Sequence, residues 1–434
     1  MMRILILFSL CLFSFLGNSQ GNWTWTKLSN LPISTSNNAV VHAKAADGKA
    51  VYSFGGISGT LSSSEIHQRV FKYDVSQDLW LEMDAIPDTS GKIASAASYV
   101  NDKIYIIGGY HVEANGTETS SEKVHIYNPI TDVFEADGNP LPIPIDDHVQ
   151  AVWRDSLIYV ISGWSNTGNV PDVQIYNPEL NSWTMGTPTP SFSFYPSFGA
   201  SGYILGDTIF YFGGAKDFPS FEATNVLRKG IIDKNDPTQI QWTVINSGNG
   251  EPLYRAACSG HDKTIFWVGG AKKAYNFNAL EYYNNKVVKP NKRIYEIDLE
   301  EKSQSNIYSV ENRGMDLRGI AKLGGGNWII AGGIDSLQQA SKATYLLHNP
   351  RLSDIGTSNK PPMFKIRESE DYFTVETENV GKIIIYDIQG RTIYKSNKQL
   401  ADLSIAKTEL QRGMLIFTYE DDVNLPIVLK KIHP

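Results

Sequence analysis

Charged side chains recur at one position ahead of a series of glycine doublets, and their types suit ligand binding or proton transfer. Arg255 and Arg318 each stand fourteen residues before the first glycine of a doublet, and His148 stands at the same distance before the Ser162-Gly163 pair. Two guanidinium groups can hold one carboxylate through charge-assisted hydrogen bonds. A histidine beside them can serve as a general acid or base. The pattern therefore indicates a candidate site for an acidic ligand.

The same count, adjusted for hairpins of different length, predicts further members of a ring around a common axis. These members are Lys92, Asn38 and Tyr195, with Asp147 and Asp316 flanking the ring. Trp164 directly follows Gly163 and is a candidate for stacking on a sugar face. A purely structural role stays open as an alternative, because arginines at such a position can instead make hydrogen bonds to a neighbouring repeat.

The elements that must position these residues form a repeat. Six apolar runs end in a glycine doublet or its variant, and the second glycines are 53, 54, 51, 56 and 63 residues apart. After each doublet come a polar loop, a strand with a tyrosine near its end, a turn, and in several copies a tryptophan and a proline. Val173 to Pro178 followed by Trp183 is a clear copy. Alternation of apolar and polar residues predicts strands, and a period near 50 predicts a β-propeller.

These repeats resemble the kelch family over roughly residues 22–350. The resemblance implies an all-β fold: a six-bladed kelch β-propeller over residues 21–350, whose glycines allow close strand approach and whose Tyr and Trp pack between blades. The sixth copy lacks a Trp, and a spare strand, Trp23 to Leu28, stands at the other end. We expect this strand to pair near Thr344 to Leu347 and so close the ring, which leaves no open sheet edge.

Galactose oxidase-type propellers share the kelch repeat in their central domain, but they use seven blades, copper and a Tyr cross-linked to a Cys. Six repeats, and Cys258 as the one cysteine after residues 1–20, disfavour that chemistry. The sequence also contains no zinc, phosphate-loop or serine-hydrolase signature. We therefore expect no metal and no cofactor.

Both ends of the chain predict export. Residues 1–20 have a short basic start, an apolar run from Ile4 to Leu16 and small residues after it, as in a secretory signal. Lipidation at Cys11 is a minor alternative. We expect the protein to be secreted or displayed at the cell surface, with the propeller held by packing because only one cysteine remains.

A polar linker is predicted over residues 351–362, followed by a small C-terminal β-sandwich over residues 363–434. Ile385 to Arg391, Leu410 to Gly413 and Lys430-Lys431 resemble the C-terminal sorting domain of the type IX secretion system of Bacteroidota. Leu415 stands where that family usually has an aromatic residue. The resemblance implies contact with the secretion machinery, and the alternative is an accessory β-domain such as a glycan-binding one.

Two function hypotheses follow. A net charge of −7 and an isoelectric point near 5.7 argue against nucleic-acid binding. The first hypothesis is a secreted binding module for glycans or protein at the propeller funnel. The alternative is an enzyme resembling sugar mutarotases and epimerases that act on acidic sugars such as sialic acid, with His148 or Asp147 moving the proton and Arg255 or Arg318 holding the acid. A structural or adhesive role completes the set.

Overall fold

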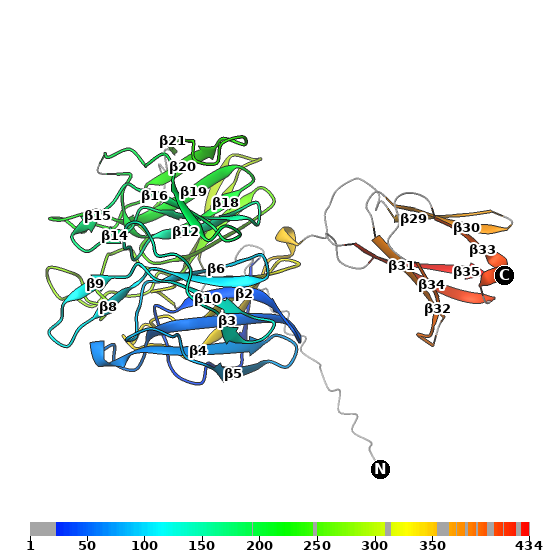
Figure 1. Cartoon of the computed structure of the whole chain (residues 1–434), viewed down its shortest axis with the longest axis horizontal. Helices are drawn as coiled ribbons and strands as arrows, with labels where there is room; N and C mark the ends of the chain where they lie inside the picture. The colour runs from blue at the N-terminus through cyan, green and yellow to red at the C-terminus, as the bar shows by residue number, and fades with distance from the viewer. Residues whose placement is uncertain are drawn as a thin grey trace, which may run out of the picture. The chain divides into compact units, whose positions relative to one another are not determined.

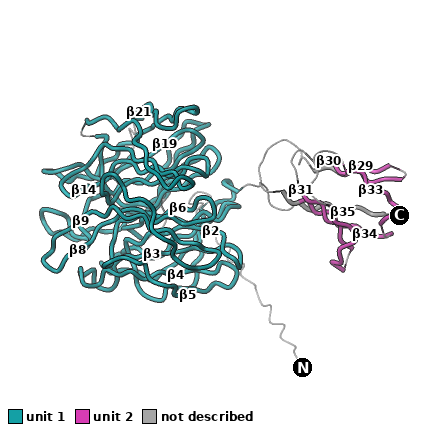
Figure 2. Tube along the Cα trace, viewed as in Figure 1, with its two compact units in different colours: residues 1–353 teal, residues 354–434 magenta. Residues whose placement is uncertain are grey.

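The computed structural model divides the chain into two compact units, residues 1–353 and 354–434 (Figure 2). It describes residues 23–192, 194–245, 250–308 and 314–353 of the first unit, and residues 364–369, 371–377, 381–387, 389–396, 403–410, 412–421 and 427–433 of the second. The predicted signal segment, residues 1–20, and most of the predicted linker, residues 354–362, lie outside the described residues.

The first unit contains six four-stranded antiparallel sheets, numbered here in chain order. Sheet 1 consists of β2 (Ala39–Ala45), β3 (Gly48–Ile57), β4 (Ile66–Asp74) and β5 (Leu79–Met83). Sheet 2 consists of β6 (Ala96–Val100), β7 (Lys103–Ile107), β10 (Val124–Asn128) and β11 (Val133–Phe134). Sheet 3 consists of β12 (Val149–Trp153), β13 (Leu157–Ile161), β16 (Val173–Asn177) and β17 (Ser182–Met185).

The later sheets repeat the same order. Sheet 4 consists of β18 (Phe198–Leu205), β19 (Thr208–Ala215), β20 (Leu227–Ile232) and β21 (Ile240–Ile245). Sheet 5 consists of β22 (Ala257–His261), β23 (Thr264–Val268), β24 (Arg293–Asp298) and β25 (Ser303–Tyr308). Sheet 6 consists of β26 (Ala321–Gly324), β27 (Asn327–Ala331), β28 (Thr344–His348) and β1 (Thr24–Leu28).

The predicted pairing of the two ends of the repeat region is confirmed. Strand β1 runs antiparallel to β28, with Thr24 opposite His348 and Leu28 opposite Thr344. The buried Trp23, directly before β1, adds a contact to the neighbouring sheet: its ring centre lies 4.6 Å from that of Phe266 in sheet 5. Sheet 6 is thus built from both ends of the repeat region.

The first strand of each sheet lies innermost. Strands β2, β6, β12 and β18, all labelled in Figure 1, contact one another in that order. Strand β2 also contacts β26. The glycine doublets lie where one sheet approaches the next. A Cβ on Gly213 would lie 2.1 Å from the carbonyl oxygen of Leu253, and a Cβ on Gly108 would lie 2.3 Å from that of Ile145. The expectation that these glycines permit close strand approach is therefore confirmed.

The loops that follow the doublets carry two small hairpins, which lie on the same side of the first unit, at the left of Figure 1. They are β8 (Tyr110–Val112) with β9 (Glu118–Ser120), and β14 (Trp164–Ser165) with β15 (Gly168–Asn169). Two 3-10 turns, η1 (Ser63–Glu65) and η2 (Pro350–Leu352), complete the unit. We call the surface made by these post-doublet loops the loop face.

The second unit contains two antiparallel sheets. One consists of β29 (Phe364–Glu368), β30 (Tyr372–Thr377) and β33 (Leu403–Ala406), and the other of β32 (Thr392–Lys395), β31 (Gly381–Tyr386), β34 (Gly413–Asp421) and β35 (Ile427–His433). The 3-10 turn η3 (Lys407–Glu409) follows β33. Phe373 and Ile405 from the first sheet share one hydrophobic core with Ile385 and Phe417 from the second. Among the described residues, no helix is long and apolar enough to cross a membrane.

Candidate functional site

One residue at the entrance to each innermost strand has a left-handed backbone. These residues are Asn37, Ala94, Asp147, Gly199, Arg255 and Asp316, with φ between 47° and 67°. Such φ values are uncommon for residues other than glycine and signal a position held by its surroundings. The six sheets therefore share one specialised backbone position next to the axis.

Hydrogen bonds join these positions into a ring. The backbone N–H of Gly199 donates to the carbonyl of Asp147 at 2.8 Å, and that of Arg255 donates to Gly199 at 2.8 Å. The links Asp147 to Ala94, Leu317 to Arg255 and Asn37 to Asp316 span 3.0–3.2 Å. The side chain of Asn37 accepts from the N–H of Ala94 at 2.8 Å and completes the circle. Every sheet is thereby tied to its neighbours at the axis.

Arg255 forms a buried ion cluster inside this ring. Its Nε lies 3.1 Å from both carboxylate oxygens of Asp147, and its Nη1 lies 3.0 Å from Oδ1 of Asp316. The three side chains are at most 2% exposed. The guanidinium also lies 5.1 Å from the ring centre of Tyr254 and 5.5 Å from that of Tyr275. We call Arg255, Asp147 and Asp316 the axial ion cluster.

The guanidinium of Arg255 has its counter-charges inside the protein. Burial lowers and the Asp147 charge raises the pKa of Arg255, and the net effect is a pKa well above its ordinary value. Burial raises the pKa of Asp316, and hydrogen bonds from Ser36 and Arg255 oppose that rise. The carboxylates that the guanidinium contacts thus belong to the chain itself. The structure favours the structural alternative for Arg255, which we left open on the sequence.

Arg318 lies at the edge of this cluster. Its Nη2 donates to the carbonyl oxygen of His148 at 2.9 Å, and its Nη1 lies 3.5 Å from Oδ1 of Asp147. In the described part of the chain, its buried Nε has no hydrogen-bond partner. Arg255 and Arg318 therefore do meet at one carboxylate, as their spacing predicted for a ligand, but that carboxylate is Asp147.

A central channel of about 330 Å³ runs along the innermost strands. Side chains with polar or titratable groups in its lining include those of His42, Tyr99, His148, Gln150, Cys258, Arg318 and Lys322. Lys322 donates to the carbonyl of Gly260 at 2.8 Å and lies over the ring of Tyr203. Among the described residues, the lining holds no aspartate or glutamate. The channel is thus a cationic cavity, which suits an acidic group.

His148 reaches the channel as predicted, and it is uncharged at neutral pH. Burial first, and then the charge of Arg318, lower the pKa of this imidazole to about 4. Nε2 lies 3.0 Å from Oε1 of Gln150, whose amide donates to Oγ of Ser98. Nδ1 is buried without a hydrogen-bond partner among the described residues. His42, also on the channel wall, has its pKa lowered to about 4, chiefly by burial.

Two other ring candidates point elsewhere. Asn38 donates to Oγ of Ser53 at 2.8 Å and to the carbonyl of Ala331 at 3.3 Å, so it joins sheets 1 and 6. Tyr195 lies in the segment before β18, and its carbonyl accepts from the Tyr211 hydroxyl at 3.0 Å. The structure brings neither residue into the channel lining.

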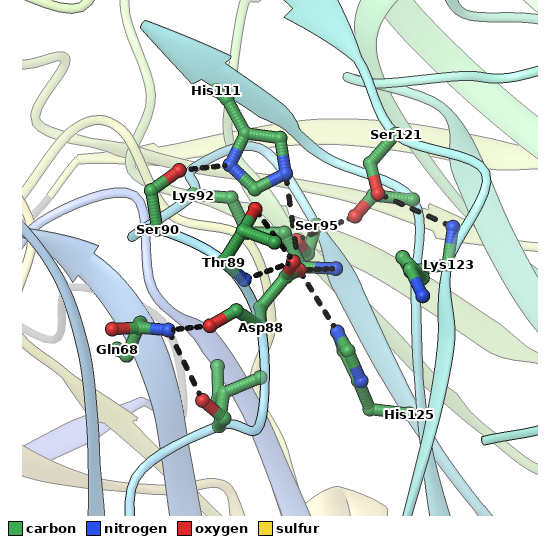
Figure 3. A network of polar contacts seen from close by, with 12 residues as sticks. Gln68, Asp88, Thr89, Ser90, Lys92, Ser95, His111, Ser121, Lys123 and His125 are labelled. Carbon is green, nitrogen blue, oxygen red and sulfur yellow. Dashed lines mark hydrogen bonds and ion pairs between the residues drawn. The ribbon is translucent and has the colours of Figure 1, made fainter.

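Lys92 belongs to a separate network between sheets 1 and 2 (Figure 3). Its Nζ lies 3.2 Å from Oδ2 of Asp88, and Nε2 of His125 lies 3.0 Å from the same oxygen. Nδ1 of His125 in turn meets Asp137 at 2.8 Å. Burial lowers the pKa of Lys92 to about 8. Lys92 therefore serves contacts between neighbouring sheets rather than the channel.

Trp164 lies on the loop face in a second cavity, of about 60 Å³. Its lining is Tyr110, Glu118, Asp146, Asp147, Trp164, Phe198, Phe221, Arg255 and Tyr282. We call this cavity the loop-face pocket. The sequence pointed to Trp164 and to Asp147 and Arg255, but not to Phe221 or Tyr282, which stand in loops without a repeated pattern. Their aromatic character in post-doublet loops was the one available signal.

The described residues contain no group of three or more His, Cys, Asp or Glu side chains arranged to hold a metal ion.

Comparison with known proteins connects these features to a family. Residues 41–270 match the family described as the KLHDC2/KLHL20/DRC7 Kelch-repeats domain. Among curated proteins, the human Kelch repeat and BTB domain-containing protein 12 is 26% identical over 242 residues, which is 52% of this chain and 37% of that protein. Alpha-scruin of Limulus polyphemus is 26% identical over 216 residues, covering 48% of this chain and 22% of its own length.

These matches span well under half of each relative's length. Among solved structures, one titled "Structure of YjhT" superposes with a TM-score of 0.57 at 14% identity and covers 73% of this chain and 95% of that one. At this identity the likeness concerns the fold, a β-propeller.

Proposed function

This chain belongs to the kelch-repeat family, and on that premise we propose that its first unit is a closed six-bladed propeller acting as a secreted binding module for a protein or glycan. Kelch propellers generally bind proteins. Six sheets, the β1–β28 pairing and the hydrogen-bonded ring at the axis support closure. In this proposal each sheet is one blade.

The observation that carries the proposal is the charge of the central channel. Arg318 and Lys322 line it, and no described lining residue is acidic. The buried Nε of Arg318 lacks a partner among the described residues, so a ligand oxygen there would satisfy an otherwise unpaired donor. We therefore propose that the ligand presents a carboxylate to the channel.

Calorimetric titration with sialic acid, glucuronic acid and an acidic peptide tests this proposal. Arg318→Met should weaken binding about tenfold or more, because a charge-assisted hydrogen bond contributes roughly 1.5–3 kcal/mol. Lys263→Met is a matched control, since Lys263 is exposed and pairs with Glu300 outside the channel. Unchanged affinity in Arg318→Met, or equal binding of a neutral sugar, would reject a carboxylate site in the channel.

A second candidate function, sugar mutarotation or epimerisation on an acidic sugar, is favoured by one observation. His148 is neutral, its Nδ1 is unpaired within the described residues, and Arg318 is next to it. A neutral imidazole can accept a proton from a sugar hydroxyl while Arg318 holds the acid. Asp147 is less suited because both arginines occupy it. NMR rates of anomer exchange, compared between the parent protein and His148→Gln, decide between catalysis and binding alone.

We also propose that the protein is exported through a signal at residues 1–20 and a sorting domain at its C-terminal unit. In that unit, Asp387 accepts hydrogen bonds from the N–H groups of Gln389 and Arg391, both at 2.9 Å. This compact turn carries Gly390 and Arg391, which belong to the first of the three segments on which the resemblance rests. Removal of residues 363–434 should leave a folded propeller in the periplasm of a type IX-competent host, and continued export of the shortened chain would reject the proposal.

A further inference from the structure

We propose that the loop-face pocket binds an organic ammonium group, presented by a lysine side chain of a protein partner. This pocket is separate from the central channel, because the two cavities share no lining residue: Asp147 and Arg255 line the pocket, whereas Arg318 lines the channel. The proposal therefore stands or falls independently of the channel ligand.

Aromatic rings from several sheets converge in the pocket. Trp164 lies 5.4 Å from Phe198 and 5.8 Å from Phe221, measured between ring centres. Phe221 lies 4.7 Å from Tyr282, and Phe198 lies 6.0 Å from Tyr282. Tyr110, the first residue after the doublet of sheet 2, also lines the pocket. The faces of aromatic rings attract cations, and such a group of rings is suited to ammonium ligands.

Of the three carboxyl groups in the lining, Asp146 and Glu118 lie outside the axial ion cluster. Asp146 is 5% exposed, and its Oδ2 accepts a hydrogen bond from the Ser120 hydroxyl at 2.6 Å. The side chain of Glu118 is exposed to solvent, and its carboxyl group accepts a hydrogen bond from the side chain of Asn276. Within the described residues, no lysine or arginine forms an ion pair with Asp146 or Glu118. A cation would give both carboxylates a partner.

The charges of the lining favour a cation over an anion. Arg255 is the one basic side chain among the described residues that line the pocket, and Asp147 and Asp316 already neutralise it. Burial first, and then the negative charge of Asp147, raise the pKa of Asp146 well above its usual range. Protein atoms around the carboxyl group of Glu118 displace part of its water and also raise its pKa, although the side chain keeps contact with solvent. An acidic ligand would be repelled here, whereas an ammonium group would stabilise the ionised carboxyl groups.

The size of the pocket and its neighbour indicate a protein as the source of the ammonium group. About 60 Å³ accommodates a head group and not a whole ligand. Phe221 and Tyr282 also line an adjoining open hollow of about 400 Å³. Phe218 and Tyr283 are exposed by 72% and 58% beside it. Exposed aromatic residues around a small pocket are typical of protein contact surfaces.

The test compares n-butylammonium, which has the lysine side chain, with 1-butanol, its neutral isostere. Saturation-transfer NMR on the full chain measures binding, and the indole resonance of Trp164, assigned through Trp164→Leu, reports its location. We expect the amine to bind and to shift that resonance, and the alcohol not to bind. Asp146→Asn, which keeps the shape and can still accept from Ser120, should weaken amine binding at least tenfold.

Glu118→Gln provides a second variant on an exposed position, in case Asp146→Asn fails to fold, and should weaken binding severalfold. Glu113→Gln is the matched control, because Glu113 is exposed in the same β8–β9 hairpin but does not line the pocket. Equal binding of amine and alcohol, binding of acetate instead, or no shift of Trp164 would overturn the proposal. A lysine-containing peptide that binds more tightly than n-butylammonium would support a protein source, and one that does not bind would overturn that source.

Discussion

The central channel and the loop-face pocket share no lining residue and have opposite chemistry. The channel is lined by the innermost strands and carries Arg318 and Lys322 without a described acidic residue. The pocket is lined by loops and carries Asp146 and Glu118 among aromatic rings. Both use the same repeated backbone frame. The comparison shows that the repeated backbone sets the positions of side chains, whereas the residue type at each position, and so its charge, differs from one repeat to the next.

Residues of the axial ion cluster line the pocket, and the cluster is also part of the architecture. Arg255 joins Asp147, which is 108 residues away in sequence, to Asp316, which is 61 residues away. A buried charge that loses its partner is costly. The two sites can therefore differ in charge, because the carboxylates of Asp147 and Asp316 are paired with Arg255, and Asp147 also with Arg318.

The largest expected effect on stability comes from removing the cation of the axial ion cluster. Arg255→Met leaves Asp147 and Asp316 buried without their shared cation, so we expect the free energy of unfolding to fall by about 3–5 kcal/mol. Urea unfolding measures this loss. Arg154→Met is the control, because the exposed Arg154–Asp207 pair at 2.9 Å should contribute about 1 kcal/mol or less. An Arg255→Met protein as stable as the control would show that the axial ion cluster does not stabilise the folded state.

Acidification should affect the two sides in opposite directions. The pKa of His148 is lowered from 6.5 to about 4, so below pH 6.5 the unfolded chain takes up a proton that the folded chain refuses. Stability is then lost as pH falls, by about 2 kcal/mol at pH 5 for this one residue. On the loop face the pKa of Asp146 is raised, so the folded state binds its proton more readily and gains stability as pH falls.

Urea unfolding at pH 7.5 and pH 5 separates these contributions. His148→Gln should reduce the loss of stability on acidification by about 2 kcal/mol. Asp146→Asn should make the same loss larger, because it removes the opposing contribution. If both variants change the pH dependence in the same direction, the direction assigned to one of these two pKa shifts is wrong.

The smallest expected effect on stability comes from Phe221→Ala. This partly exposed side chain packs on Tyr282 and Tyr283, so its removal should cost about 1 kcal/mol or less. Binding of n-butylammonium should nevertheless fall severalfold, while titration of the channel with acidic ligands stays unchanged. Tyr203→Leu, on the channel wall beside Lys322, should do the reverse. Loss of both activities in either variant would contradict two independent sites.

Local sequence determined much of this protein. Alternating strands and glycine doublets specify a repeat, since residue period and tolerance of positive φ are local properties. The sixth copy lacks a Trp strand and a spare strand follows Trp23, and together they predicted the pairing of β1 with β28. The antiparallel register from Thr24 to Leu28 confirms it. The repeat tyrosines were correctly assigned to packing between neighbouring sheets, as with Tyr127 of sheet 2, whose ring centre lies 5.4 Å from that of Tyr52 in sheet 1.

Tertiary structure alone decided which side chains meet. A constant count of residues placed His148 level with Arg255, but the β12–β13 hairpin is one residue longer than β22–β23, so Asp147 holds the equivalent position. That shift turns a predicted ligand site into an internal ion pair. The pocket depends on loops from several sheets, which bring Phe221 and Tyr282 to Trp164. Such contacts follow from ring closure and loop conformation, which no local pattern encodes.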